Sequence, residues 1–137
     1  MIHKMKLKEK PFENIKNGTK TIEFRLYDEK RQKIKIGDKI EFSKLPDLQE
    51  KILVDVLDIY KDKTFKELFE RLIENKKEIE RKTNSMYQFY SKEQEEKYGV
   101  VGIKIKQEKL FIWKIWYLIG GEKENIKKIV NMKNEKE

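Results

Sequence analysis

The sequence contains no cysteine and only one histidine, His3, in 137 residues. The absence of cysteine excludes disulfide bonds, cysteine-ligated metal sites and a cysteine nucleophile. His3 lies near a terminus that we expect to be frayed, which argues against a histidine metal site and against a histidine general base. We therefore predict neither a bound metal nor a cofactor.

Long apolar segments are also missing. The longest apolar-rich run, residues 110–119, is interrupted by Lys114 and is far shorter than the ~20 residues that cross a bilayer as a helix. The first residues are charged and lack the apolar region of a signal peptide. We expect a cytoplasmic protein with no membrane partner, and a chain of 137 residues fits one domain with one modest core.

Positive charge, in contrast, is abundant and unevenly distributed. The net charge is +8. Residues 1–40 hold 12 Lys and Arg against 6 Asp and Glu, whereas residues 41–100 hold 12 against 14. A basic field attracts polyanions such as RNA or DNA, although a Lys- and Ile-rich proteome would produce the same bias without such a partner.

The most informative stretch is residues 18–25, with the sequence Gly-Thr-Lys-Thr-Ile-Glu-Phe-Arg. Apolar and polar residues alternate from Lys20 to Leu26, which predicts a half-buried strand. Its two faces carry Ile22, Phe24 and Leu26 on one side, and Thr21, Glu23 and Arg25 on the other. A carboxylate and a guanidinium beside Lys20 are typical of a polar site on a β scaffold. The alternative is a surface ion pair worth about 0 to 1 kcal/mol.

Shorter patterns predict the remaining elements. Strands are expected near residues 4–8, 39–43, 52–60 and 100–106, the third with a late bulge. Helical spacing and N-cap signals predict helices near residues 11–17, 64–73 and 91–98, and Gly18 stands where a left-handed residue ends the first of these helices. Residues 28–35 are expected to be a charged connection, and residues 75–83 either an extension of the preceding helix or a solvated loop.

The sequence contains three spaced blocks of motif residues. The first is Gly-x-Lys-x-x-Glu-x-Arg, formed by Gly18, Lys20, Glu23 and Arg25. The others are Gly-Asp-Lys-Ile at residues 37–40, and residues 90–103, which contain Tyr-Ser-x-Glu and Tyr-Gly-Val-Val-Gly-Ile. Together they resemble the ASCH domain family. The resemblance covers residues 4–106 and implies an α+β, PUA-like fold, which is a small mixed β-barrel flanked by helices. It also implies a domain at residues 1–106 followed by a C-terminal extension at residues 107–137.

The resemblance carries expectations about function. Members of the family are generally regarded as RNA-binding or RNA-associated, with polar residues in a cleft between the barrel and a helix. Some are ribonucleases, and one branch hydrolyses the amide of N4-acetylcytidine with a Lys-activated Thr nucleophile. Lys20 matches that Lys, but Glu23 stands at the position of the Thr and has no hydroxyl to deprotonate. Thr21 is expected on the opposite face of the strand from Lys20 and so does not replace it.

Three hypotheses remain open: an RNA- or nucleotide-binding module, an RNA-directed enzyme using Lys20 and Glu23 for acid–base chemistry, and a non-catalytic adaptor. The residues predicted to bind RNA or a modified nucleoside are Lys20, Thr21, Glu23, Arg25, Tyr90 and Ser91.

Each of the outlying candidate residues has a structural alternative. Tyr87, Phe89 and Tyr90 can stack on bases or close a core, and Ser91 can bind phosphate or cap a helix. Asp38 is expected to be a turn residue rather than a general acid. Residues 110–119 either pack within the chain or serve an oligomer.

Overall fold

Five strands and five helices make up the part of the chain that the computed structural model describes, residues 1–108. The strands are β1 (Ile2–Leu7), β2 (Ile22–Leu26), β3 (Lys39–Lys44), β4 (Lys51–Asp62) and β5 (Val100–Gln107). The helices are α1 (Glu9–Lys16), α2 (Glu29–Gln32), α3 (Phe65–Leu72), α4 (Lys76–Met86) and α5 (Lys92–Tyr98). This content confirms the predicted α+β class. The predictions made for residues 109–137 lie outside the described residues.

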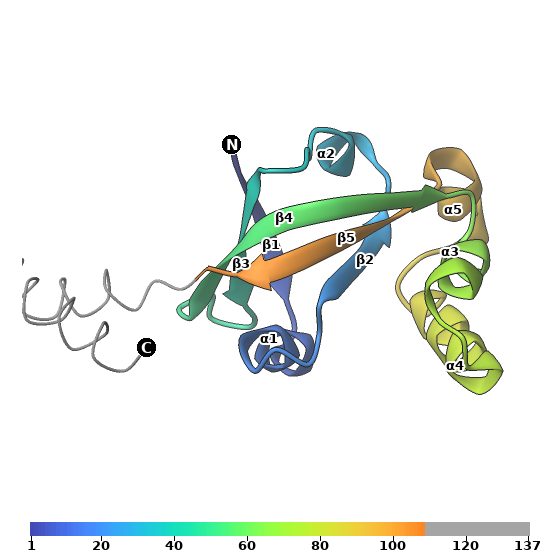
Figure 1. Cartoon of the computed structure of the whole chain (residues 1–137), viewed down its shortest axis with the longest axis horizontal. Coiled ribbons are helices and arrows are strands. Elements are labelled where there is room, and N and C mark those ends of the chain that lie inside the picture. The colour runs from blue at the N-terminus through green and yellow to red at the C-terminus, as the bar shows by residue number, and fades with distance from the viewer. Residues whose placement is uncertain (109–137) are drawn as a thin grey trace, which may run out of the picture. The chain divides into compact units, whose positions relative to one another are not determined.

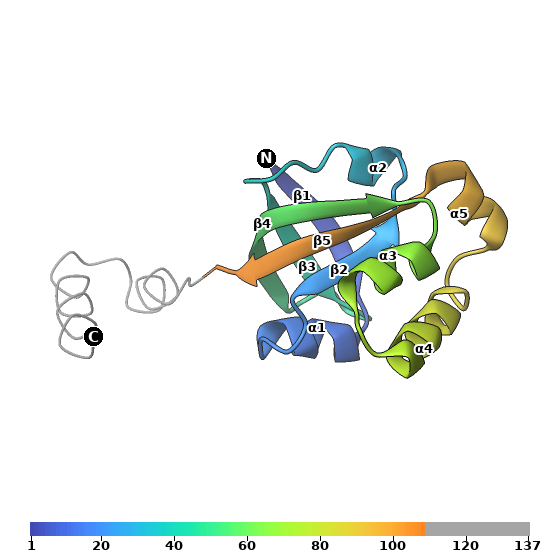
Figure 2. The same ribbon diagram turned by 45° about the vertical axis from the view of Figure 1, so that its right-hand side comes forward.

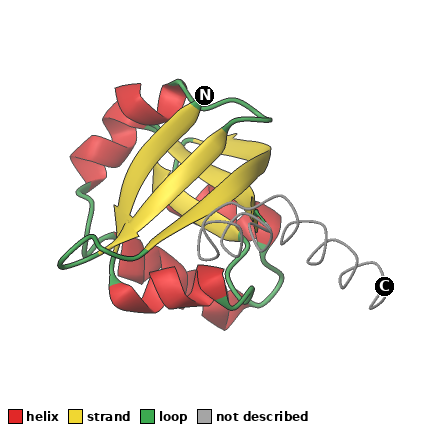
Figure 3. Cartoon of the chain, turned by 90° about the vertical axis from the view of Figure 1, so that its left-hand side faces the viewer, coloured by secondary structure: helices red, strands yellow, loops and turns green. Residues whose placement is uncertain are grey.

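The five strands form one curled sheet in the order β1-β3-β4-β5-β2. Strand β1 runs parallel to β3, and the other neighbours are antiparallel. Figures 1 and 3 show the sheet curled into a half-barrel with helices around it. The mixed, PUA-like architecture expected from the resemblance is therefore confirmed. The expected bulge in β4 is also present, as a register shift between Val56 and Asp58.

One face of the sheet and helix α1 enclose the first hydrophobic core. Strand residues alternate between buried and exposed positions, so every second side chain points inward. The inward residues that form this cluster include Met5, Leu7, Ile40, Phe42, Val54, Val56, Val101, Ile103 and Ile105. Phe12 and Ile15 of α1 pack into the same cluster, three residues apart on one face of the helix. Helix α1 is thereby held directly before the turn that leads to β2.

A second core lies on the other face of β2 and β5, under helices α3 to α5. It contains Leu26 and Val100 from the strands and Phe65, Leu68 and Phe69 from α3. The ring of Phe69 meets the ring of Phe24 edge to face, with the centroids 4.8 Å apart, and Figure 2 shows α3 in front of β2. The predicted apolar face of β2 therefore packs against α3.

The two edge strands of the sheet, β1 and β2, are linked by a side chain rather than by a backbone ladder. The Nη2 group of Arg25 donates a hydrogen bond to the backbone oxygen of Lys6, at 2.9 Å. We call the line where β1 and β2 approach each other the seam. The seam places the Gly18 to Arg25 stretch at the open side of the half-barrel.

Two predicted connections are helical. Residues 29–32 form α2, because Asp28 accepts a hydrogen bond from the backbone N–H of Arg31 at 3.1 Å and so caps a short turn. Residues 76–86 form α4, with Asn75 as its N-cap. The predicted charged connection at residues 28–35 therefore contains a short helix that the prediction missed. Residues 75–83 are helical, but they belong to a separate helix and not to an extension of α3.

The N-terminus is ordered into the sheet, contrary to the expectation that His3 is frayed. His3 is 8% exposed, and its Nε2 lies 2.8 Å from Oδ2 of Asp38. Pairing of β1 with β3 from Ile2 onward holds it there. Hydrogen bonds from His3 and from the backbone N–H of Lys35 lower the pKa of Asp38 to about 2. Asp38 thus has the predicted turn role, and it also ties the terminus to the turn.

Candidate functional site

The turn before β2 positions two of the predicted site residues. Gly18 ends α1 with a positive φ of +85°, as predicted. Beyond it, the backbone N–H of Lys20 donates to the oxygen of Asn14 at 2.9 Å, and the oxygen of Thr21 accepts from the N–H of Ile105 at 2.9 Å. These two bonds tie the turn to α1 and to β5, so the Lys20 and Thr21 side chains start from a fixed backbone.

Replacing Gly18 by Val should lower the free energy of unfolding by more than about 1 kcal/mol, because a β-branched residue does not tolerate a left-handed backbone. An added Cβ at this position meets no atom within 4 Å, so the loss reflects backbone strain and not a clash. Urea denaturation measures it. Gly18→Asn is the control, since Asn visits this conformation and should lose less. Equal stability of Gly18→Val and the unchanged protein would contradict the turn geometry.

Glu23 is the centre of the polar motif, and it is buried. It pairs with Ile103 across β2 and β5, so its side chain shares the inward face of the sheet with that of Ile103. The residue is 3% exposed. Its Oε1 lies 3.0 Å from Nζ of Lys20 and accepts from the N–H of Phe24 at 3.1 Å, and its Oε2 lies 3.4 Å from Nη2 of Arg25. The polar face expected for the strand is therefore the face that points into the barrel.

This arrangement presents two cations fixed by one buried carboxylate. The side chains of Lys20 and Arg25 are 25% and 16% exposed, against 5% for Glu23. An ammonium has three N–H donors, and the contact with Glu23 uses one of them. Lys20 is therefore held by the protein yet reachable from outside.

Lys20 lines a pocket of about 390 Å³ between the outer face of β2 and helices α3 and α4. Apolar walls are supplied by Phe24, Phe69 and Met86, and polar groups by Lys20, Thr21, Lys82 and Ser85. The ammonium of Lys82 lies 5.9 Å from the centroid of the Phe24 ring. Apolar walls with a few polar groups and two cations suit a flat, anionic ligand such as a nucleotide.

A second pocket, of about 300 Å³, adjoins the same turn and is lined by Lys16, Gly18, Lys20, Thr21 and Lys106. Lys20 and Thr21 thus line both pockets. The expectation that the strand begins at Lys20 was wrong, because β2 begins only at Ile22 and both residues precede it. The alternation of faces along a strand therefore does not apply to Lys20 and Thr21.

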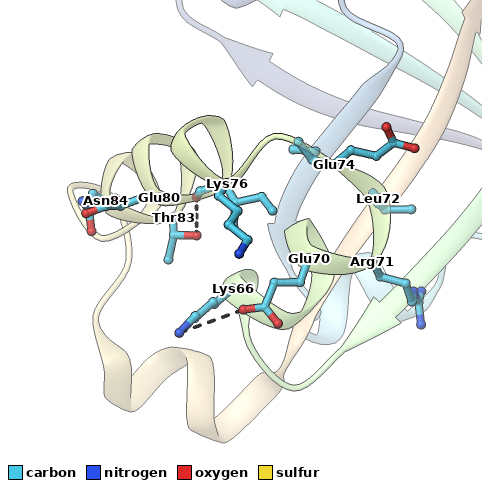
Figure 4. A pocket seen from close by; sticks show the side chains of 11 residues that line it. Lys66, Glu70, Arg71, Leu72, Glu74, Lys76, Glu80, Thr83 and Asn84 are labelled. Carbon is cyan, nitrogen blue, oxygen red and sulfur yellow. Dashed lines mark hydrogen bonds and ion pairs between the residues drawn. The ribbon is translucent and has the colours of Figure 1, made fainter.

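A larger pocket, of about 910 Å³, lies elsewhere, between α3 and α4. Figure 4 shows its charged rim, with the ion pair of Lys66 and Glu70 at 3.9 Å and the Thr83 hydroxyl bonded within α4. Its lining has three basic residues and three acidic ones, Lys66, Arg71 and Lys76 against Glu70, Glu74 and Glu80. We give it less weight as a polyanion site, because its charges balance and it contains no residue of the Gly18 to Arg25 stretch.

A model of the ASCH domain matches residues 5–109. The chain belongs to the ASCH domain family. The solved structure of the hypothetical protein PH0355 is 39% identical, with a TM-score of 0.67 over 79% of this chain and 100% of that one. The structure of PF0455 from Pyrococcus furiosus is 38% identical, with a TM-score of 0.62 over 80% of this chain and 99% of that one.

A more distant ASCH structure shows the fold alone. It is ZmASCH from Zymomonas mobilis, solved as a serine-to-alanine mutant, at 15% identity and a TM-score of 0.50 over 96% of this chain and 95% of that one. Comparison with curated proteins gives no match.

The aromatic part of the predicted ASCH site is used mainly for packing. The ring of Tyr90 stacks on Phe65, with the centroids 5.7 Å apart. The hydroxyl of Tyr87 donates to the buried carboxylate of Glu95 at 2.9 Å, and burial, followed by the hydrogen bond and charge of Glu95, raises the pKa of Tyr87. Ser91 forms the predicted capping box of α5 with Gln94. These placements do not bring Tyr90 or Ser91 into a contact with Lys20.

The sequence did not predict the wall that α4 contributes to the 390 Å³ pocket. Lys82, Ser85 and Met86 come from α4, in a highly charged stretch that could equally have been a loop. The N-cap Asn75 was the available signal for a helix. Within residues 1–108 no helix is long and apolar enough to cross a membrane, and no group of three or more His, Cys, Asp or Glu side chains could hold a metal ion.

Proposed function

We propose that this ASCH domain binds RNA or a nucleotide, with Lys20 as the principal contact to phosphate. The observation that carries the proposal is the buried Glu23 carboxylate, which holds Lys20 at 3.0 Å beside the 390 Å³ pocket. The Glu23 side chain is only 5% exposed, which is unusual for an acidic residue unless it is paired. The pairing here fixes the ammonium of a residue that also lines this pocket.

Arg25 supports this role in a second way. It contacts Glu23, and its Nη2 also reaches the backbone of β1, so part of its donor capacity maintains the seam. A guanidinium has five N–H donors, which leaves donors for an anion. We therefore assign Lys20 to direct binding, and Arg25 to binding and closure of the seam together.

RNA-directed hydrolysis is the second candidate. It is favoured by one observation, that Thr21 and Ser85, which both carry hydroxyls, line the same pocket as Lys20. A nucleophile must lie within hydrogen-bonding distance of a base, and both oxygens of Glu23 already accept hydrogen bonds. Binding without chemistry therefore ranks first. Chromatography of short RNAs and of N4-acetylcytidine after incubation with the protein separates the two, since only an enzyme produces a new species.

We expect single-stranded RNA to bind with an affinity that falls as salt rises, by about 0.7 in the logarithmic slope for each neutralised phosphate. Lys20→Met should lower the affinity and reduce the slope by about 0.7, because it removes one phosphate contact. Fluorescence anisotropy at several salt concentrations measures both quantities.

Lys66→Met is the matched control for this experiment. Lys66 is 69% exposed and pairs with Glu70 on the rim of the α3–α4 pocket, so the substitution removes the same charge away from the motif. Equal losses in the two variants would show that net charge alone attracts RNA. Absence of RNA binding at any salt concentration would leave the adaptor hypothesis as the better description.

A further inference from the structure

We propose that Phe89 is a base-stacking platform for single-stranded RNA that runs along the seam between β1 and β2. The inference rests on the RNA-binding role proposed above and specifies the form of the ligand and its path. It assigns a binding role to a residue outside the Gly18 to Arg25 stretch.

Phe89 differs from its aromatic neighbours in being exposed. Tyr87 is engaged by Glu95 and Tyr90 by Phe65, whereas Phe89 is 56% exposed and belongs to neither hydrophobic core. Its backbone N–H donates to the oxygen of Met86 at 3.1 Å, so the turn that ends α4 fixes its position. The three aromatic residues look alike in sequence, and the fold leaves this one open to a ligand.

Basic side chains adjoin Phe89 and continue along the seam. The ammonium of Lys8 lies 5.0 Å from the centroid of the Phe89 ring. Lys6 and Lys8 are exposed while Met5 and Leu7 are buried, so the β1 side of the seam carries positive charge outward. A phosphate backbone that follows this edge meets one cation after another.

The charge continues from β1 to β2 and beyond. Arg25 reaches the backbone of Lys6 at 2.9 Å. Burial and the nearby charges of Arg31, Arg25 and Lys6 lower the pKa of Lys30. Lys30 therefore belongs to the same group of basic side chains as Arg25 and Lys6. Glu23 pairs with Arg25, and the charge of Asp28 acts on Lys30 in the opposite direction, raising its pKa.

The seam also connects Phe89 with the Lys20 pocket. Met86, whose oxygen binds the Phe89 backbone, lines that pocket together with Lys20. Glu23 joins Lys20 to Arg25, and Arg25 joins β2 to β1. One strand of RNA can therefore place a phosphate or a nucleotide at Lys20 and a second base at Phe89.

The exposed aromatic ring favours single-stranded over double-stranded RNA. A base can lie flat on an aromatic side chain only when it is free of its helical stack, and a basic groove with such a platform is typical of single-strand binding. The exposed contact of Lys8 with the ring is weaker than base stacking. A base can therefore displace the ammonium, which then remains available to phosphate.

The test compares Phe89→Ala, Phe89→Trp and Ile36→Ala. Phe89→Ala should weaken the binding of a short single-stranded RNA about 5- to 100-fold, with an unchanged salt slope because no charge is lost. Phe89→Trp should retain the affinity, since it retains a ring. Ile36 is 63% exposed, and its replacement controls for the loss of an exposed apolar side chain. Lys8→Met should reduce the salt slope by about 0.7.

A second readout follows the base itself. Fluorescence of 2-aminopurine within the RNA should be quenched on binding to the unchanged protein and less quenched with Phe89→Ala, because stacking on the ring is lost. Melting temperatures of the variants should match, since an exposed substitution rarely alters stability appreciably.

The outcomes separate this inference from the proposed function. If the protein binds RNA and Lys20→Met weakens binding while Phe89→Ala does not, the platform is wrong and the proposed function stands. Tighter binding of a duplex than of either of its strands also overturns the platform. If no RNA binds, both proposals fall. If Phe89→Ala weakens RNA binding and Phe89→Trp binds RNA as tightly as the unchanged protein, the stacking role of Phe89 is supported.

Discussion

Glu95→Ala should lower the free energy of unfolding by about 2 to 4 kcal/mol, because it leaves a buried backbone N–H and a partly buried hydroxyl without an acceptor. Glu95 is 5% exposed. Its Oε2 accepts from the N–H of Phe65 at 2.9 Å, at the first residue of α3, and the Tyr87 hydroxyl donates to both oxygens at 2.9 and 3.1 Å. One carboxylate from α5 therefore holds the start of α3 and the end of α4.

Urea denaturation measures the loss, and two variants act as controls. Glu93→Ala changes an exposed Glu of the same helix and should stay within about 0.5 kcal/mol. Glu95→Gln keeps the shape and one acceptor, so its loss should be smaller than that of Glu95→Ala. If Glu95→Ala were as stable as Glu93→Ala, the carboxylate would not be organising these helices.

Structure encoded by neighbouring residues could be predicted from the sequence. Thr64 caps α3 by accepting from the N–H of Glu67 at 3.1 Å, and Ser91 and Gln94 form a capping box. Gly18 adopts the left-handed conformation expected after α1. In each case the interacting groups lie within a few residues, so the local pattern contains the whole interaction.

Interactions between distant segments could not be predicted in the same way. Glu93, Glu95 and Glu96 are similar in sequence, and only the packing of α5 on α3 selects Glu95 for burial. Arg25 meets Lys6 because β1 and β2 are the edges of one curled sheet. The alternation of apolar and polar residues in β2 correctly predicted which side chains share a face. It did not predict that both faces are covered, one by α3 and the other by the interior of the barrel.

The burial of Glu23 changes what its substitution can reveal. A stability loss in Glu23→Gln does not by itself distinguish a structural ion pair from a functional site. The structure predicts a loss in both cases, because the carboxylate accepts from Lys20, Arg25 and the N–H of Phe24. Lys20 also has a local partner that sequence did not reveal, so Lys20→Met should cost about 1 kcal/mol rather than nothing.

We expect Glu23→Gln to lower the free energy of unfolding by about 2 to 3 kcal/mol, since a neutral amide cannot balance two cations that are partly removed from water. Arg25→Met should lose a similar amount, because it removes the bond across the seam as well as a partner of Glu23. Melting curves and RNA affinity should be measured on both variants and on Lys20→Met. Glu23→Gln should also weaken RNA binding, because Lys20 loses the group that orients it.

Among these variants, Lys20→Met distinguishes a ligand-binding site from a purely structural cluster of ion pairs. Its predicted stability loss is small compared with the stability of a typical domain, which is about 5 to 15 kcal/mol, so the variant remains folded and any loss of affinity belongs to the missing ammonium. Lys16→Met is the matched control, because Lys16 lines the adjoining pocket but pairs with Glu50 at the surface. If Lys20→Met bound RNA as tightly as Lys16→Met while Glu23→Gln and Arg25→Met lost stability, the cluster would serve only to close the half-barrel. A selective loss in Lys20→Met would instead mean that the buried carboxylate is retained to aim a cation at a ligand.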